Sequence, residues 1–232
     1  MDHDETHAVA ERYARRVGLS SDRYSPLRPE VWQMLHERQR VMLKRMAAFG
    51  FTDFASLRVA EVGCGTGGNL LELLRLGFDP AHLFGAELLP ERLELARNTL
   101  PAATTLWLGD ATQAPLHPES QDIVLQSTVF SSLLDDAFQQ RLADAMWRWL
   151  KPGGAVLWYD FTVDNPRNPD VRGVPLRRLH ELFPQALITS DRVTLAPPLA
   201  RLVCRWHPGL YGLFNALPLL RTHILAWAHK KP

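Results

Sequence analysis

A glycine-rich stretch near residue 60 restricts the fold of this chain more than any other feature. Residues 58–62 predict a short buried strand, glycines at 63, 65, 67 and 68 predict a tight loop, and leucines between 70 and 76 predict the apolar side of a helix. Glycine tolerates a positive φ and, without a Cβ, lets a ligand approach the backbone. This order of elements predicts a nucleotide-binding corner in an α/β fold.

Two classes of ligand use such a corner. Gly63, Gly65 and Gly68 have the spacing of a dinucleotide loop, and Glu87 follows where that loop requires an acid for a ribose. Glu61, however, stands two residues before the first glycine. A carboxylate there favours a cationic ligand over a pyrophosphate.

Three motifs in order along the chain carry a family resemblance. The sequence Glu-Val-Gly-Cys-Gly-Thr-Gly at residues 61–67 resembles the first motif of the class I S-adenosylmethionine (SAM) dependent methyltransferases. Gly-Asp-Ala at residues 109–111 matches the family's acid for the adenine amino group, and Trp-Leu-Lys-Pro-Gly-Gly at residues 149–154 resembles its turn before the fifth strand. The resemblance covers residues 56–161.

The resemblance and the hydrophobic periodicity together give an expected architecture. We expect an α/β fold with a Rossmann-like, doubly wound, mostly parallel seven-stranded sheet whose last strand is antiparallel. Residues 1–50 predict an N-terminal helical cap with helices at 5–17 and 30–49, and residues 51–232 a single methyltransferase domain. Within it, residues 197–220 predict two short helices inserted before a last strand at 222–230.

The resemblance implies SAM as the cofactor and identifies the residues that would bind it. Glu87 would accept the ribose hydroxyls, and Asp110 would face the adenine amino group. The expected cofactor-binding residues are Tyr24, Glu61, Gly63, Cys64, Gly65, Gly67, Asn69, Glu87, Leu88, Gly109, Asp110, Ala111 and Gln126. We expect no metal, because the sequence shows no cluster of metal ligands.

Methyl transfer from SAM requires an aligned acceptor and, for a hydroxyl, a group that accepts its proton. Asp160, His180 and His223 are the candidate catalytic bases. Residues 126–132 lack the Asn/Asp-Pro-Pro-Tyr/Phe signature of enzymes that methylate amino groups of bases or of glutamine. We therefore expect O-methylation of a small molecule, such as a sugar, a secondary metabolite or a lipid-linked intermediate.

Two other functions remain open at this point. An NAD(P)-linked oxidoreductase agrees with the glycine spacing and Glu87, although the chain lacks an evident Tyr-x-x-x-Lys motif. A non-catalytic SAM-binding protein agrees with the absence of an assigned base.

Charge and composition add expectations about partners and compartment. Residues 51–165 hold seven Lys/Arg against fifteen Asp/Glu, whereas residues 166–232 hold ten against three. Dispersed arginines are not a nucleic-acid footprint, so we expect no nucleic-acid partner, although residues 197–220 offer peripheral membrane contact. A polar start and two scattered cysteines predict a cytoplasmic protein, either a monomer or a homodimer.

Overall fold

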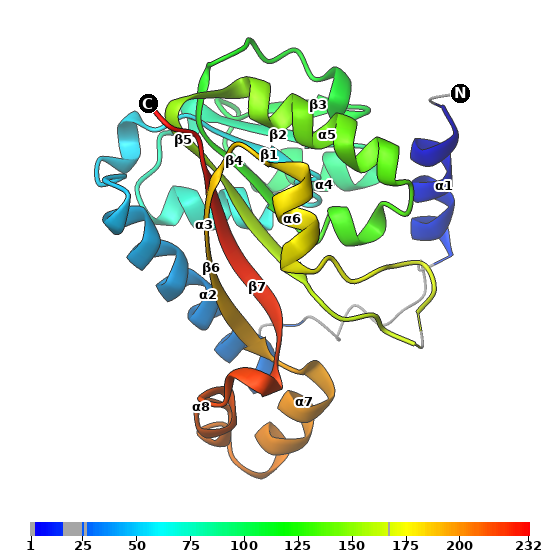
Figure 1. The fold of residues 1–232 in the computed structure, drawn as a ribbon, viewed down its shortest axis with the longest axis vertical. Coiled ribbons are helices and arrows are strands. Elements are labelled where there is room, and N and C mark those ends of the chain that lie inside the picture. The colour runs from blue at the N-terminus through cyan, green and yellow to red at the C-terminus, as the bar shows by residue number, and fades with distance from the viewer. Residues whose placement is uncertain (1–2, 16–24, 26, 167) are drawn as a thin grey trace.

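The computed structural model describes residues 3–15, 25, 27–166 and 168–232 (Figure 1). Tyr24, one of the expected cofactor-binding residues, lies outside these described residues. Strands and helices alternate along most of the chain, as expected for an α/β fold.

The helices are α1 (His3–Ala14), α2 (Pro29–Ala48), α3 (Gly68–Arg75), α4 (Pro90–Thr99), α5 (Asp136–Trp149), α6 (Leu176–Leu182), α7 (Pro197–Trp206) and α8 (Leu210–Asn215). The strands are β1 (Val59–Val62), β2 (Leu83–Glu87), β3 (Thr105–Leu108), β4 (Gln121–Ser127), β5 (Leu150–Phe161), β6 (Leu187–Leu195) and β7 (Arg221–His229).

All seven strands form one sheet in the order β3-β2-β1-β4-β5-β7-β6. Strands β1 to β5 pair in parallel, whereas β7 runs antiparallel between β5 and β6. The strand order reverses between β1 and β4, and ligands of open α/β sheets bind at such a point, outside the carboxyl ends of the strands. The predicted fold class is confirmed.

Two apolar clusters cover the two faces of the sheet. Residues from α2, α3 and α4 pack on one face, and residues from α1, α5 and α6 pack on the other (Figure 1). Neighbouring β1 residues alternate between these clusters, since Val59 belongs to the first and Ala60 to the second. The two N-terminal helices thus lie on opposite faces of the sheet, and the domain division at residue 50 stays a prediction.

The segment 151–154 differs from the sequence prediction. Instead of a separate sharp turn before a strand, these residues form the irregular start of β5, which begins at Leu150. The β4–β5 register shifts between Gln121 and Ile123, and Gly153 adopts a φ of +82°. The glycine therefore allows a bulge within the strand, where the sequence suggested a chain reversal.

Helices α7 and α8 form a small projection beyond the ends of β6 and β7 (Figure 1). Leu195, Ala200, Val203, Cys204 and Tyr211 form a third apolar cluster between them and the sheet. Among the described residues, no helix combines the length and apolar character needed to cross a bilayer.

Candidate functional site

The glycine loop between β1 and α3 adopts a conformation that side chains would oppose. Gly63 and Gly65 have φ values of +65° and +57°. A Cβ at Gly63 would lie 2.6 Å from Cγ2 of Val129, which follows β4. The backbone N–H of Cys64 donates to the carbonyl of Ala86 at 2.9 Å, so the loop is also fixed to β2. Glycine is thus required both for backbone conformation and for close packing.

Glu87, at the end of β2, is tied to this loop. The N–H of Gly65 donates to its Oε2 at 2.8 Å, and the N–H of Leu89 donates to its Oε1 at 2.9 Å. The side chain is buried, yet each carboxylate oxygen has a second lone pair. Glu87 can therefore hold the loop and still accept hydrogen bonds from a ligand.

Glu61 lies buried beneath the loop with one oxygen unsatisfied. Asn69 Nδ2 donates to its Oε1 at 2.5 Å, whereas its Oε2 has no hydrogen-bond partner among the described residues. Burial raises the pKa of Glu61 to about 8, although Asn69 and nearby Arg38 act in the opposite direction. A buried carboxyl oxygen without a partner is costly, and a cationic group of a ligand would satisfy it.

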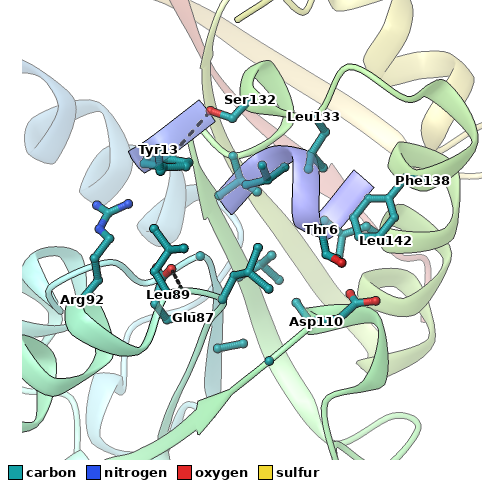
Figure 2. Close-up of a pocket in the computed structure, with 18 of the residues that line it drawn as sticks. Thr6, Tyr13, Glu87, Leu89, Arg92, Asp110, Ser132, Leu133, Phe138 and Leu142 are labelled. Atoms are coloured by element: carbon teal, nitrogen blue, oxygen red, sulfur yellow. Dashed lines mark hydrogen bonds between the residues drawn. The ribbon is translucent and has the colours of Figure 1, made fainter. Parts of the chain in front are cut away.

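A pocket opens at the carboxyl ends of β1, β2, β3 and β4, next to the glycine loop (Figure 2). Its walls come from the loop, the strand ends, α5 and, on the open side, α1. The lining residues are Thr6, Val9, Tyr13, Val62, Gly63, Ala86, Glu87, Leu88, Leu89, Arg92, Gly109, Asp110, Ala111, Ser127, Thr128, Val129, Ser132, Leu133, Phe138 and Leu142.

Helix α1 covers this pocket and is held there by polar contacts. In Figure 2, Tyr13 lies on the Arg92 side and Thr6 on the Asp110 side. Arg12 donates to Glu5 at 2.6 Å and to the carbonyl of Ser132 at 3.1 Å. The sequence analysis expected a helical cap at residues 1–50 but did not indicate which of its helices would cover the pocket, because no local pattern shows which distant element a helix will contact.

The turn after β4 forms the pocket wall opposite β2. Thr128 has a φ of +58°, a conformation that non-glycine residues rarely adopt. Its N–H donates to the carbonyl of Tyr159 at 2.8 Å, and buried Gln126 accepts from the N–H of Val129 at 3.1 Å. Side chains thus hold a strained turn on the pocket wall, as is common at functional sites.

The expected cofactor-binding residues fall into two groups. Those on the pocket wall are Gly63, Glu87, Leu88, Gly109, Asp110 and Ala111. Those that do not line this pocket are Glu61, Cys64, Gly65, Gly67, Asn69 and Gln126, of which Asn69 lines a smaller pocket together with Arg38 and Ser127. The second group contains residues that shape the loop and strand ends, and their binding roles stay predictions.

The three candidate bases do not line the pocket. Asp160 is fully buried and accepts from the N–H groups of Ser131 and Phe161, which makes it a structural anchor. Burial raises its pKa to about 7. His180 is exposed on α6. His223 stacks on Tyr159 with 5.1 Å between ring centroids, and burial lowers its pKa to about 4.

Arg38 on α2 is a further residue that the sequence analysis missed. Its guanidinium donates to Asn69 at 2.8 Å and to Glu72 at 3.1 Å, and lies 5.2 Å from the ring centroid of Tyr159. A weaker contact of 3.4 Å reaches the hydroxyl of Ser127 on the pocket wall. No local sequence pattern indicates this role, since an arginine on an amphipathic helix is usually solvated. Within the described part of the chain, no cluster of three metal-ligating side chains occurs.

Comparison with known proteins agrees with this geometry. Residues 59–154, which contain the glycine loop and the strand ends around the pocket, match a family described as a methyltransferase domain. The chain contains a class I SAM-dependent methyltransferase domain. The family predicted from the motifs is confirmed, and the dinucleotide alternative has no support.

Solved structures have the same fold as this methyltransferase domain. The alignment with a SAM-dependent methyltransferase from Mesorhizobium loti covers 81% of this chain and 96% of that protein, with 16% identity and a TM-score of 0.60. A phosphoethanolamine N-methyltransferase from Haemonchus contortus, in complex with SAM, covers 82% of the chain with 19% identity and a TM-score of 0.58. The methyltransferase domain aligns with 52% of that protein.

Curated relatives differ in their acceptors. A tRNA N(3)-methylcytidine methyltransferase, Mettl2, from Drosophila melanogaster is 31% identical over 44% of this chain, which spans 34% of that protein. A trans-aconitate 2-methyltransferase from Afipia carboxidovorans is 30% identical to this chain. The alignment covers 73% of this chain and 59% of that protein. The chain thus spans about a third of the length of the first curated relatives.

The relatives correct two expectations. We expected a small-molecule hydroxyl as acceptor and no nucleic-acid partner, whereas tRNA N(3)-cytidine methyltransferases such as METTL2 from Gallus gallus and METTL2B from Homo sapiens contradict both. The count of charges was a poor guide to nucleic-acid binding, because it averages over a whole segment. It does not show which substrate a small site can bind.

Proposed function

We propose that this methyltransferase domain binds SAM in the pocket beneath α1 and methylates a nucleophile that has a free electron pair at neutral pH. The first candidate is the N(3) atom of cytidine in RNA. The observation that carries the proposal is a pocket whose polar groups fit the cofactor but, among the described residues, include no free base.

The residues around the pocket fit the parts of SAM. Glu87 would accept from the ribose hydroxyls, and Asp110 would accept from the adenine amino group; both line the pocket. The unsatisfied oxygen of Glu61 suits the ammonium group, and the guanidinium of Arg38 suits a carboxylate. SAM supplies a methyl group activated by its sulfonium. Glycine at 63 lets the ligand approach the backbone beside the turn after β4.

The pocket wall lacks a base that a hydroxyl acceptor would require. Its titratable residues, in the described part of the chain, are Tyr13, Glu87, Arg92 and Asp110. In this proposal Glu87 and Asp110 bind the ribose and the adenine of SAM through their remaining lone pairs, so neither carboxylate is left as a base for the acceptor. A hydroxyl has a pKa far above 7 and must lose its proton to a base during transfer.

A pyrimidine ring nitrogen such as N(3) of cytidine has a lone pair at neutral pH and can attack without a base. A carboxylate has the same property. These are the acceptors implied by the names of the tRNA N(3)-cytidine and trans-aconitate methyltransferases, so the relatives and the absence of a base support the same chemistry.

The test is transfer of labelled methyl from SAM to unmodified tRNA transcripts, followed by nucleoside analysis. We expect label in 3-methylcytidine, and a loss of at least tenfold in the rate for Glu87→Gln. Label on trans-aconitate with none on tRNA would overturn the RNA acceptor in favour of a carboxylate. Failure to bind SAM in calorimetry would overturn the whole proposal.

A further inference from the structure

The projection formed by α7 and α8 has an outer surface that its own core does not explain. On α7, Ala200, Val203 and Cys204 face inward in the third apolar cluster. Leu202 and Trp206 are four residues apart on the same helix and are 55% and 82% exposed. Because residues four apart share one face of a helix, α7 has a second apolar stripe on the side opposite the cluster.

The second helix also has an exposed side. Tyr211 and Asn215 are buried, whereas Leu213 on α8 is 67% exposed and Leu217, two residues beyond the end of α8, is 56% exposed. Leu219, just beyond, is 91% exposed. Several exposed apolar side chains on one small projection mark an interaction surface, because single exposed leucines are common but groups of them are not. We call these five residues the outer surface: Leu202, Trp206, Leu213, Leu217 and Leu219.

The charges on the projection itself are of one sign. Residues 196–220 contain Arg201 and Arg205 and no Asp or Glu. On the inner side of α7, by contrast, burial and the nearby carboxylate of Glu30 on α2 raise the pKa of Cys204. Arg201 and Arg205 lie on α7 beside the apolar stripe, and neither forms an ion pair within the described residues. Such a surface is complementary to an anionic partner that also accepts aliphatic side chains.

The projection is anchored, so its outer surface is held in place. Buried Glu37 on α2 accepts from Tyr211 at 3.0 Å and from Asn215 at 2.7 Å, and it also accepts from the N–H of Thr194 at 3.0 Å. These bonds join α8 and β6 to the long helix α2. The fold therefore fixes the orientation of α8 and, with it, the exposure of the leucines.

From these contacts, we propose that the outer surface docks on a lipid bilayer that contains anionic phospholipids. Leucine and tryptophan side chains would enter the boundary between headgroups and acyl chains, and the arginines would contact the phosphates. RNA would contact the arginines but would leave the leucines in water, so the apolar share of the surface favours lipid.

The experiment is co-sedimentation of the full chain with vesicles of phosphatidylcholine alone or of phosphatidylcholine mixed with the anionic lipid phosphatidylglycerol. We expect binding to the anionic vesicles, weakened by salt. Trp206→Ser combined with Leu213→Ser is expected to reduce the partition coefficient at least tenfold. Leu95→Ser, at an exposed leucine on α4, is the matched control and is expected to bind as the unaltered chain does.

Three results would overturn the proposal. The first is no binding to anionic vesicles, and the second is equal binding by the double variant and the unaltered chain. The third is that the unaltered chain binds no vesicles but shifts tRNA in a gel, or forms a dimer in ultracentrifugation, and that the double variant loses this interaction. Circular dichroism of both variants checks that they are folded. Because neither this control nor vesicle binding requires SAM, failure here is distinct from failure of the proposed function.

Discussion

The carboxylate of Glu87 accepts a hydrogen bond from the backbone N–H of Gly65, with 2.8 Å between Oε2 and N. The two residues end neighbouring elements, since Glu87 closes β2 and Gly65 belongs to the loop after β1. The acid expected to bind ribose therefore also fixes the loop. Cofactor affinity and loop geometry are coupled through one side chain.

Glu87→Gln tests this coupling. One glutamine oxygen can replace one acceptor, but the amide –NH₂ group then faces a backbone N–H donor and leaves it unsatisfied. The free energy of unfolding is expected to fall by about 1–3 kcal/mol, because a buried donor is left without a partner. We expect SAM affinity in calorimetry to fall by at least tenfold. Glu91→Gln, at an exposed site on α4, is the control and is expected to bind SAM normally.

Gly63→Ala tests the close packing of the glycine loop. The new Cβ would lie 2.6 Å from Val129 at a φ of +65°, so both contact and conformation oppose it. We expect a loss of roughly 1–3 kcal/mol in the free energy of unfolding, measured in urea. Gly68→Ala is the matched control, because a Cβ there has nothing within 4 Å. Equal stability of the two variants would contradict this account.

Arg12→Ala tests the attachment of α1. The substitution removes the donor to Glu5 and to the carbonyl of Ser132, both at buried or partly buried sites. We expect faster hydrogen exchange in residues 3–14 and faster dissociation of SAM in stopped-flow measurements. His7→Ala, at an exposed position on the same helix, controls for helix propensity. Unchanged exchange in the Arg12 variant would show that the remaining contacts of α1, such as the bond from the N–H of Leu134 to Glu5 at 2.8 Å, are sufficient to hold it.

Glu61→Gln tests the buried carboxyl group through pH. Glu61 has a folded pKa raised to about 8, above its unfolded value near 4.5, so the folded state holds the proton more tightly. Its contribution to stability is thus present at low pH and is lost as pH rises between these values. Arg38 lowers this pKa, whereas Glu87 and Glu72 raise it.

The variant keeps the acceptor for Asn69 but has no charge. Without ligand, the unaltered chain should lose stability from pH 5 to pH 8, whereas the variant should not lose this contribution. The free energy of unfolding of the variant, relative to the unaltered chain, should therefore increase over this range, at about 1.4 kcal/mol for each unit of pKa difference. Because a ligand ammonium would favour the ionised form, SAM should release protons on binding to the unaltered chain and none from this site in the variant. Equal proton release in calorimetry with two buffers would contradict this assignment.

Local patterns were sufficient for much of the fold and part of the site. The positive φ values at Gly63 and Gly65 and the acids that end β2 and follow β3 are consequences of residue type and spacing over short distances. For that reason, the order of motifs predicted the sheet, the loop and the positions of Glu87 and Asp110.

Long-range packing was beyond such patterns. Tyr13 contacts Ser132 across 119 residues, and Arg38 contacts Ser127 across 89. No local property of α1 or α2 specifies these partners. Asp160 illustrates the same limit, because its sequence position at a strand end suggested a base, whereas burial and two backbone donors make it an anchor.

The sequence by itself thus determined the nucleotide-binding corner, the sheet and the methyltransferase family, because glycine geometry and hydrophobic period act within a few residues. Only the tertiary structure decided which of the two N-terminal helices covers the pocket, which acids line it, and that Asp160, His180 and His223 do not line it. Burial and hydrogen bonding between distant segments control these properties. They set both the protonation and the accessibility of each side chain.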